Sequence, residues 1–191
     1  MKVKEWTTTK TIKVGNCTVV INRPKLTPEQ QQEYLNVIEE ESLRLADMAT
    51  NVLNMTKVEN QNILTEVTQF NLSEQLRTCV LMLERKWSKK SIEFSMDFGE
   101  HTIEADEELL KQVWLNLVDN AVKFSPQGGL VEIAVQSNDR YVRVSVINEG
   151  EEISKEDQKR IFNKFYQTDQ SHAAEGSGIG LAVVKRIVQL H

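Results

Sequence analysis

The segment from Glu108 to Ser125 constrains the fold most, because it combines an apolar helix face with an adjacent polar stripe. Read at the helical period, the apolar face holds Leu110, Val113, Leu117, Ala121 and Phe124. The stripe holds Gln112, Asn116, Asp119, Asn120 and Lys123. Asn is a poor helix former, so two of them four positions apart in mid-helix indicate that something outside the helix needs their amides. Together with the lysine they predict a site for a metal-bound phosphate.

Residues 116–125 (NLVDNAVKFS) resemble the asparagine box of sensor histidine kinases, which belong to the GHKL ATPase superfamily. The resemblance implies that Asn120 holds Mg²⁺, with Asn116 nearby, and that Lys123 contacts a phosphate of ATP. It also implies that Phe124 or Tyr166 borders the nucleotide.

Residues 146–153 (VINEGEEI) resemble the first glycine box of the same family, whose usual form is Asp-x-Gly-x-Gly-Ile. Asn148 stands where the family has Asp, and Glu152 replaces the second glycine. The resemblance implies that Asn148 accepts a hydrogen bond from the adenine amino group. This bond is neutral and therefore weaker than one to a carboxylate. Gly150 permits a close approach of the base to the backbone.

Residues 161–166 (IFNKFY) resemble the phenylalanine box, although Phe162 can also be interpreted as a core aromatic residue. The family usually has Arg after the tyrosine, whereas this chain has Gln167. Lys164 is then the nearest cation that could meet the terminal phosphate, and Tyr166 is the box residue expected at the nucleotide.

Residues 176–185 (GSGIGLAVVK) resemble the second glycine box. Gly176, Gly178 and Gly180 lead into an apolar helix, and their backbone amides together with the helix N-terminus predict an anion site. Leu181, which follows them, is also expected among the nucleotide-binding residues. A flexible loop is the alternative for a single glycine-rich stretch, but it does not explain the helix that follows directly. The loop between the phenylalanine box and the glycines is typical of a mobile ATP lid.

The remaining patterns predict an α+β fold, a two-layer α/β sandwich of the Bergerat ATP-binding type with helices on one face of a mixed sheet. A long helix and an N-terminal β-hairpin precede it. In chain order we expect strands 8–14 and 18–22, a helix from 27 to about 58, a helix 72–87, strands 91–97 and 103–105, a helix 108–125, strands 130–136 and 140–147, and helices 154–162 and 179–190. The expected domains are 1–26, 27–60 and 70–191.

The helix at 27–60 begins with a capping box, Thr27 with Gln30, and with Pro28 at its first position. It has a single apolar stripe, so it needs a partner helix. It resembles the second helix of the dimerisation and phosphotransfer hairpin of histidine kinases; a connector helix packed on the domain is the alternative. The hairpin at 1–26 is interpreted as a structural or artefactual extension.

Composition excludes other classes. The 191 residues are 40% hydrophobic with a net charge of −5 and no run of Lys or Arg, which argues against a nucleic-acid partner. Cys17 and Cys79 lack metal-like spacing, so free thiols in a reducing compartment are expected. No apolar run approaches 18 residues, and we therefore expect no membrane segment in this chain and a cytoplasmic location.

Two departures from the family bear on activity. The phosphoacceptor motif is missing: His101 lies between predicted strands, His172 in the lid and His191 at a terminus expected to fray. The chain also stops where the family adds two strands, so we expect an unpaired sheet edge and interpret the chain as a fragment or a fused gene. In hydrolytic relatives a Glu stands at the position of Asn116, and an amide cannot act as a general base. ATP should therefore be hydrolysed only slowly.

The leading function is the ATP-binding catalytic domain of a sensor histidine kinase, presenting Mg-ATP for phosphoryl transfer to a histidine of a partner or of a missing segment in two-component signalling. The chain alone should not autophosphorylate. The resemblance implies a response regulator and a phosphoacceptor domain as partners, with a homodimer through residues 27–60 as a further option. The alternative is a GHKL-fold module that binds nucleotide without catalysis and dimerises with a full-length kinase.

Overall fold

The computed structural model describes residues 6–14, 17–24, 26–60, 63–64, 66–138, 140–168 and 176–191. The chain forms two compact units, Met1–Asp47 and Met48–His191. Across the described ranges, no helix combines the length and the apolar character that crossing a membrane requires.

The first unit begins with a β-hairpin. Strands β1 (Trp6–Val14) and β2 (Cys17–Pro24) pair antiparallel, with a register shift between Thr8 and Lys10. The predicted strands 8–14 and 18–22 are confirmed, and both extend further than expected. The turn predicted at 15–16 lies outside the described residues.

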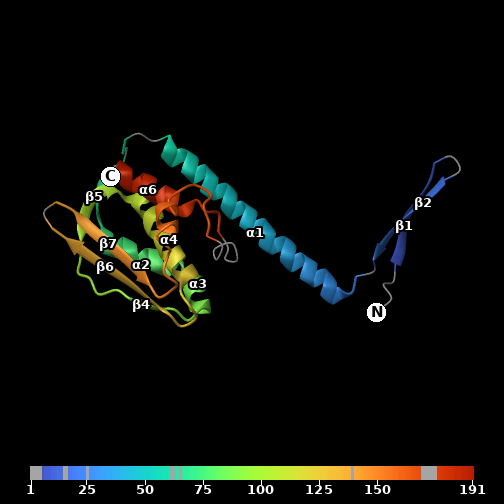
Figure 1. Cartoon of the computed structure of the whole chain (residues 1–191), viewed down its shortest axis with the longest axis horizontal. Helices are drawn as coiled ribbons and strands as arrows, with labels where there is room; N and C mark the ends of the chain where they lie inside the picture. The colour runs from blue at the N-terminus through green and yellow to red at the C-terminus, as the bar shows by residue number, and fades with distance from the viewer. Residues whose placement is uncertain are drawn as a thin grey trace. The chain divides into compact units, whose positions relative to one another are not determined.

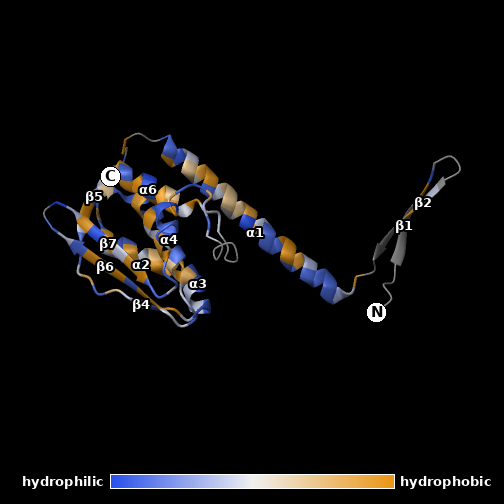
Figure 2. Ribbon diagram, in the orientation of Figure 1, coloured by the Kyte–Doolittle hydropathy of each residue, from blue (hydrophilic) through white to orange (hydrophobic). Residues whose placement is uncertain are grey.

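Helix α1 (Pro28–Glu59) starts in the first unit and ends in the second. Its capping box is confirmed: the Thr27 N–H donates to Gln30 Oε1 at 3.0 Å, and the Gln30 N–H donates to Thr27 Oγ1 at 3.3 Å. Figure 2 shows hydrophobic and hydrophilic residues interleaved along this helix. Much of its apolar surface is exposed, namely Tyr34, Leu35, Val37, Ile38, Leu43 and Leu45. Near the C-terminal end of α1, Met55 and Val58 are buried in the core of the second unit.

The strands of the second unit form two ladders. Strands β3 (Val67–Asn71) and β5 (Thr102–Asp106) pair antiparallel. In the other ladder, β6 (Leu130–Ser137) lies between β4 (Glu93–Ser95), which is parallel to it, and β7 (Val142–Asn148), which is antiparallel. The helices α2 (Leu72–Met82), α3 (Glu84–Lys89), α4 (Glu107–Phe124) and α6 (Gly180–Leu190) form the second layer (Figure 1). The predicted α+β class and mixed sheet are thus confirmed.

The central helix α4 starts at Glu107, one residue before the expected start, because the Asp106 carboxylate caps it by accepting a hydrogen bond from the Leu109 N–H at 3.0 Å. Its buried residues are Leu109, Leu110, Val113, Trp114, Val118, Ala121 and Val122. The apolar face is therefore broader than predicted at Trp114 and Val118, whereas Phe124 is 44% exposed. Trp114 is satisfied inside the core by a hydrogen bond to Gln75 Oε1 at 2.7 Å, which joins α4 to α2.

Several elements differ from the prediction. Strand β3 was missed because only Phe70 of its residues is buried, so it lacks an alternating apolar pattern. The predicted helix 72–87 breaks at Leu83: the Val80 carbonyl accepts both the Leu83 N–H at 3.1 Å and the indole N–H of Trp87 at 2.9 Å, which ends the helical ladder. The strand expected at 91–97 is reduced to residues 93–95.

The helix expected at 154–162 is also wrong. The structure has one 3₁₀ turn, η1 (Asp157–Lys159), with no buried residue. Ser154 Oγ accepts a hydrogen bond from the Asp157 N–H at 3.1 Å, but the N-cap residue of η1 is Glu156, whose side chain makes no capping hydrogen bond. A segment without an apolar face to bury has no tertiary packing to extend a single turn into a helix.

The terminal His191 does not fray as expected. Its Nε2 accepts a hydrogen bond from the Asp106 N–H at 3.1 Å, and its Nδ1 lies 2.9 Å from the Ile187 carbonyl oxygen. The end of α6 is thereby held against the start of α4. His101 contacts Ser137 Oγ at 3.2 Å, and His172 lies outside the described residues.

Candidate functional site

The polar stripe of α4 meets the first turn of α6. The Asn116 Nδ2 donates to the Gln112 carbonyl oxygen at 2.8 Å, and its Oδ1 is turned toward Gly180. A Cβ at Gly180 would stand 2.5 Å from that oxygen, so any other residue here would force the Asn116 amide to shift. The asparagine box and the second glycine box, about 60 positions apart, are therefore in direct contact.

The other two glycines of this box face different partners. Gly176 lies against the ammonium of Lys123, which would be 2.6 Å from a Cβ. Gly178 has a positive φ of 68° and packs on the backbone of Phe165 and Tyr166; the Phe165 N–H donates to its carbonyl at 2.9 Å. Three predicted boxes thus converge on residues 176–180, as an anion site built from separate segments requires.

A second cluster lies where β7 ends. A Cβ at Gly150 would stand 2.7 Å from the Phe124 carbonyl oxygen and 3.0 Å from Asn148 Nδ2. The loop after β7 therefore passes closely over the last turn of α4. Asn148 is half-buried, and the Phe124 ring lies 4.9 Å from Lys123 Nζ. An amide that can donate and accept lies in the same cluster as an accessible aromatic ring, a combination suited to a flat heterocyclic base.

Asn120 lies on α4 between these two clusters and is half-buried. The structure shows no hydrogen bond of its side chain to any described residue. Among the described residues no group of three or more His, Cys, Asp or Glu could hold a metal ion. A metal here would thus depend on amide oxygens, water and the ligand's own oxygens, which is a donor set that suits Mg²⁺.

Two other stripe residues behave differently. Asp119 points to Lys86 on α3, with 2.5 Å between Oδ1 and Nζ, so it is part of an exposed ion pair outside the site. The Gln112 Oε1 is buried, and no described residue donates to it. An unpaired buried acceptor costs about 1–3 kcal/mol, which marks this turn of α4 as unusual.

The phenylalanine box is anchored by a network that the sequence did not reveal. The Tyr166 hydroxyl and the Ser154 hydroxyl both donate to the Asp157 carboxylate. Both hydrogen bonds lower the pKa of the Asp157 carboxyl, and the one from Tyr166 has the larger effect. The Arg160 guanidinium stacks 4.5 Å from the centre of the Tyr166 ring. The capping pattern Ser154-x-x-Asp157 was the available signal.

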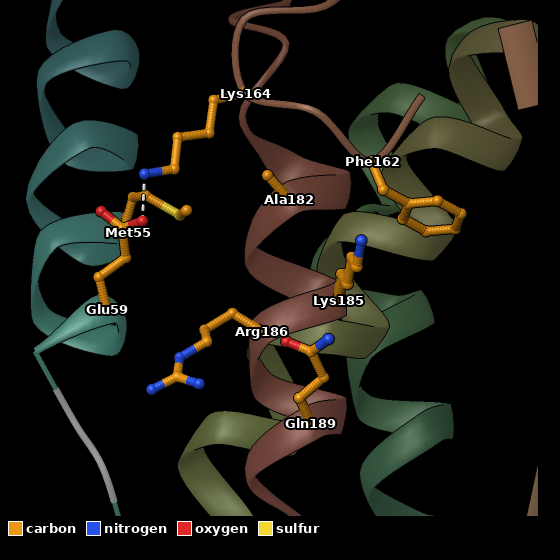
Figure 3. Close-up of a pocket in the computed structure, with 8 residues that line it drawn as sticks. All are labelled: Met55, Glu59, Phe162, Lys164, Ala182, Lys185, Arg186 and Gln189. Atoms are coloured by element: carbon orange, nitrogen blue, oxygen red, sulfur yellow. Dashed lines mark ion pairs between the residues drawn. The ribbon is translucent and has the colours of Figure 1, made fainter. Parts of the chain in front are cut away.

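The interpretation of Phe162 as a core residue is wrong, since its side chain is 39% exposed. It lines a cavity of about 330 Å³ between α1 and α6, drawn in Figure 3. Lys164 forms an ion pair there with Glu59 of α1. The structure therefore brings this lysine to α1, and shows no contact of it with Asn120 or Lys123.

Helix α1 also reaches the glycine box, because Asn51 Nδ2 lies 3.4 Å from the hydroxyl of Ser177. Leu181 follows in the first turn of α6 and is half-buried. The last part of α1 thus contacts residues from two of the predicted boxes, as the alternative of a helix packed on the domain requires, although the particular contacts were not predicted.

Comparison with known proteins agrees with this arrangement. The family described as histidine kinase-, DNA gyrase B-, and HSP90-like ATPase matches residues 105–191. Sensor histidine kinase CusS of Escherichia coli O6:H1 is 32% identical over 154 residues, which are 80% of this chain but only 32% of CusS. The chain therefore spans about a third of the length of that relative.

Solved structures are similar as well. The catalytic domain of histidine kinase ThkA is 35% identical with a TM-score of 0.58, and the match covers 65% of this chain and 81% of that domain. Full-length ShkA in complex with AMPPNP is 31% identical with a TM-score of 0.71, over 87% of this chain and 35% of ShkA. Its fold, its sequence similarity and the contact between its sequence motifs show that this chain belongs to the catalytic ATP-binding domains of the sensor histidine kinase family.

Proposed function

We propose that this chain binds Mg-ATP and presents it for phosphoryl transfer to a histidine that another segment supplies. The observation that carries the proposal is the contact of Asn116 and Lys123 with the glycines of residues 176–180. A row of amides and one ammonium thereby faces backbone amides at the start of a helix, which suits a polyphosphate with its cation. ShkA, a structural neighbour, was solved with AMPPNP.

Each side chain takes a role from its place in the site. Asn120 supplies an amide oxygen to Mg²⁺, which would neutralise phosphate charge when bound. Lys123 contacts a phosphate, and Gly176, Gly178 and Gly180 give the phosphates access to the backbone. Because Asn116 carries an amide, it cannot remove a proton from water. The site therefore favours transfer over hydrolysis.

The base lies at the other cluster. Asn148 accepts from an amino group of the base, Gly150 allows its close approach, and Phe124 offers a ring for stacking. Tyr166 borders the nucleotide through its ring, since its hydroxyl is engaged by Asp157. Leu181 forms part of the wall at the start of α6. Lys164 reaches the terminal phosphate only after leaving Glu59.

The partners follow from the same proposal. His101 contacts Ser137 and His191 contacts Asp106 and Ile187, so both described histidines have structural roles. We therefore place the acceptor histidine in another domain; His172 lies outside the described residues and does not enter this argument. A response regulator is the expected final acceptor; ThkA, 34% identical over 75% of this chain, was solved in complex with response regulator protein TrrA. The exposed apolar residues of α1 offer a surface for a second copy or for the acceptor helix, and a cytoplasmic location is consistent with these partners.

A non-catalytic nucleotide-binding module is the second candidate. The ion pair of Lys164 with Glu59 favours it, because it engages the lysine that was expected at the terminal phosphate. A separately supplied acceptor helix pair distinguishes the two candidates: a catalytic domain labels its histidine from γ-labelled ATP, whereas a binding module does not.

The binding step itself is tested by calorimetry with Asn120→Ala. Loss of one ligand to a charged group removes about 1.5–3 kcal/mol, so the affinity for Mg-ATP should fall about ten- to a hundredfold. Equal affinities of the variant and the parent for Mg-ATP would refute the assignment of the metal site.

A further inference from the structure

The C-terminus of α4 is closed by a lysine that precedes the helix in sequence. Lys90 Nζ lies 3.0 Å from the carbonyl oxygen of Val122, 2.7 Å from that of Lys123 and 2.9 Å from that of Ser125. An ammonium has three protons to donate, and the last carbonyls of a helix lack helical partners. The positive charge also lies at the negative end of the helix dipole.

The neighbouring carbonyls are satisfied differently. The Ala121 carbonyl accepts the N–H of Ser125 at 3.0 Å and its hydroxyl at 2.7 Å. The Phe124 carbonyl faces Gly150. The carbonyl of Lys90 itself accepts the Gly128 N–H at 2.9 Å. Lys90 therefore holds the helix end through its side chain and the following turn through its backbone.

The same helix turn carries two residues of the proposed site. Lys123 lies against Gly176 of the glycine box, and the Phe124 backbone supports Gly150 beside Asn148. Fraying of this turn would therefore disturb both the phosphate end and the base end of the site. Without the ammonium, the three carbonyl oxygens would have to accept hydrogen bonds from water instead.

We infer that Lys90 is a positioning residue of the nucleotide site, whose ammonium keeps the last turn of α4 in the conformation that presents Lys123 and Phe124 to the ligand. The inference rests on the proposed function, because it concerns the same site. Lys90 acts through the carbonyl groups that it holds.

The test compares Lys90→Met with the parent chain and with Lys86→Met, measuring Mg-ATP affinity by calorimetry and amide hydrogen exchange along α4. Lys86 is a matched control because it also contacts α4, but through the exposed carboxylate of Asp119. Lys90→Arg serves as the conservative variant, because its guanidinium keeps the positive charge and several N–H donors for the carbonyl oxygens. Where Lys90→Met does not fold, Lys90→Gln, which keeps two donors, takes its place in the comparison.

We expect Lys90→Met to bind Mg-ATP at least about tenfold more weakly than the parent chain. Relative to the parent, amide hydrogen exchange should become faster at residues 123–128, and it should change less at the start of α4. Lys86→Met should match the parent, and Lys90→Arg should recover most of the affinity. A lowered melting temperature with unchanged affinity would show a purely structural cap and overturn the inference. If the parent itself bound no nucleotide, the proposed function would fail, whereas the exchange data would still report on the cap.

Discussion

Replacement of Gly180 by alanine tests the contact between the asparagine box and the glycine box. The new Cβ would stand 2.5 Å from Asn116 Oδ1, whereas ordinary van der Waals contact begins near 3.4 Å. The Asn116 side chain is held by its bond to the Gln112 carbonyl, so it cannot move away without losing that bond. The substitution should therefore displace the amide from the site.

The two effects on stability partly offset each other. Overpacking costs about 1–3 kcal/mol, whereas exchanging glycine for alanine in a helix gains roughly 0.5–1 kcal/mol. Net destabilisation should therefore be at most about 2.5 kcal/mol, and the protein should remain folded. The loss of a positioned amide beside the metal should still lower Mg-ATP affinity about tenfold.

Chemical unfolding and calorimetry measure the two quantities, and a double-mutant cycle isolates the contact. In Asn116→Ala/Gly180→Ala the clashing oxygen is gone, so the pair should be more stable than the sum of the single variants by about 0.5–3 kcal/mol. Gly99→Ala is the matched control, because nothing lies within 4 Å of its Cβ position. Additive effects in the cycle would refute the proposed contact.

Three further predictions concern neighbouring groups. In the folded protein the hydrogen bond from Tyr166 lowers the pKa of Asp157. The contribution of this carboxylate to stability is therefore present above the unfolded pKa of about 4 and is lost as the pH falls through the folded pKa. Tyr166→Phe should reduce this loss of stability in acid, which urea unfolding between pH 7 and pH 3 measures. Glu59→Gln removes the ion-pair partner of Lys164. Since exposed ion pairs are worth roughly 0.2–1 kcal/mol, calorimetry should show ATP affinity raised by at most about fivefold relative to ADP affinity. A lower ATP affinity would contradict the proposed role of the lysine. Asn148→Asp should tighten Mg-ATP binding about threefold or more, because a hydrogen bond to a charged acceptor is stronger, and it should not tighten Mg-tripolyphosphate binding.

Much of the fold and of the site's composition could be predicted from local patterns. The cap at Asp106 and the capping box of Thr27 with Gln30 depend on residues three apart, so the sequence displays them directly. Resemblance to a family supplied the association of residues 116–125 with residues 176–180. The contact of Asn116 with Gly180 was not predicted, because it depends on how closely α6 packs against α4.

The rest depends on side chains that meet across large separations. Lys90 reaches the end of α4 from 32 or more positions away, and nothing near it in the sequence indicates an unpaired carbonyl. The ion pair of Lys164 with Glu59 joins two segments more than 100 positions apart, and no periodic pattern indicates that they meet. The break at Leu83 is different: the Trp87 indole donates to the Val80 carbonyl only seven positions back, a local side-chain contact that helix propensity does not indicate.

The most direct test of the account is the ¹H–¹⁵N spectrum of the full chain during titration with Mg-ATP. Binding at the proposed site should shift the side-chain amides of Asn116 and Asn120 and the backbone amides of Gly176, Gly178 and Gly180, and withdrawal of Mg²⁺ should weaken these shifts. Shifts confined to the cavity between α1 and α6, or no shifts at millimolar Mg-ATP, would contradict the account.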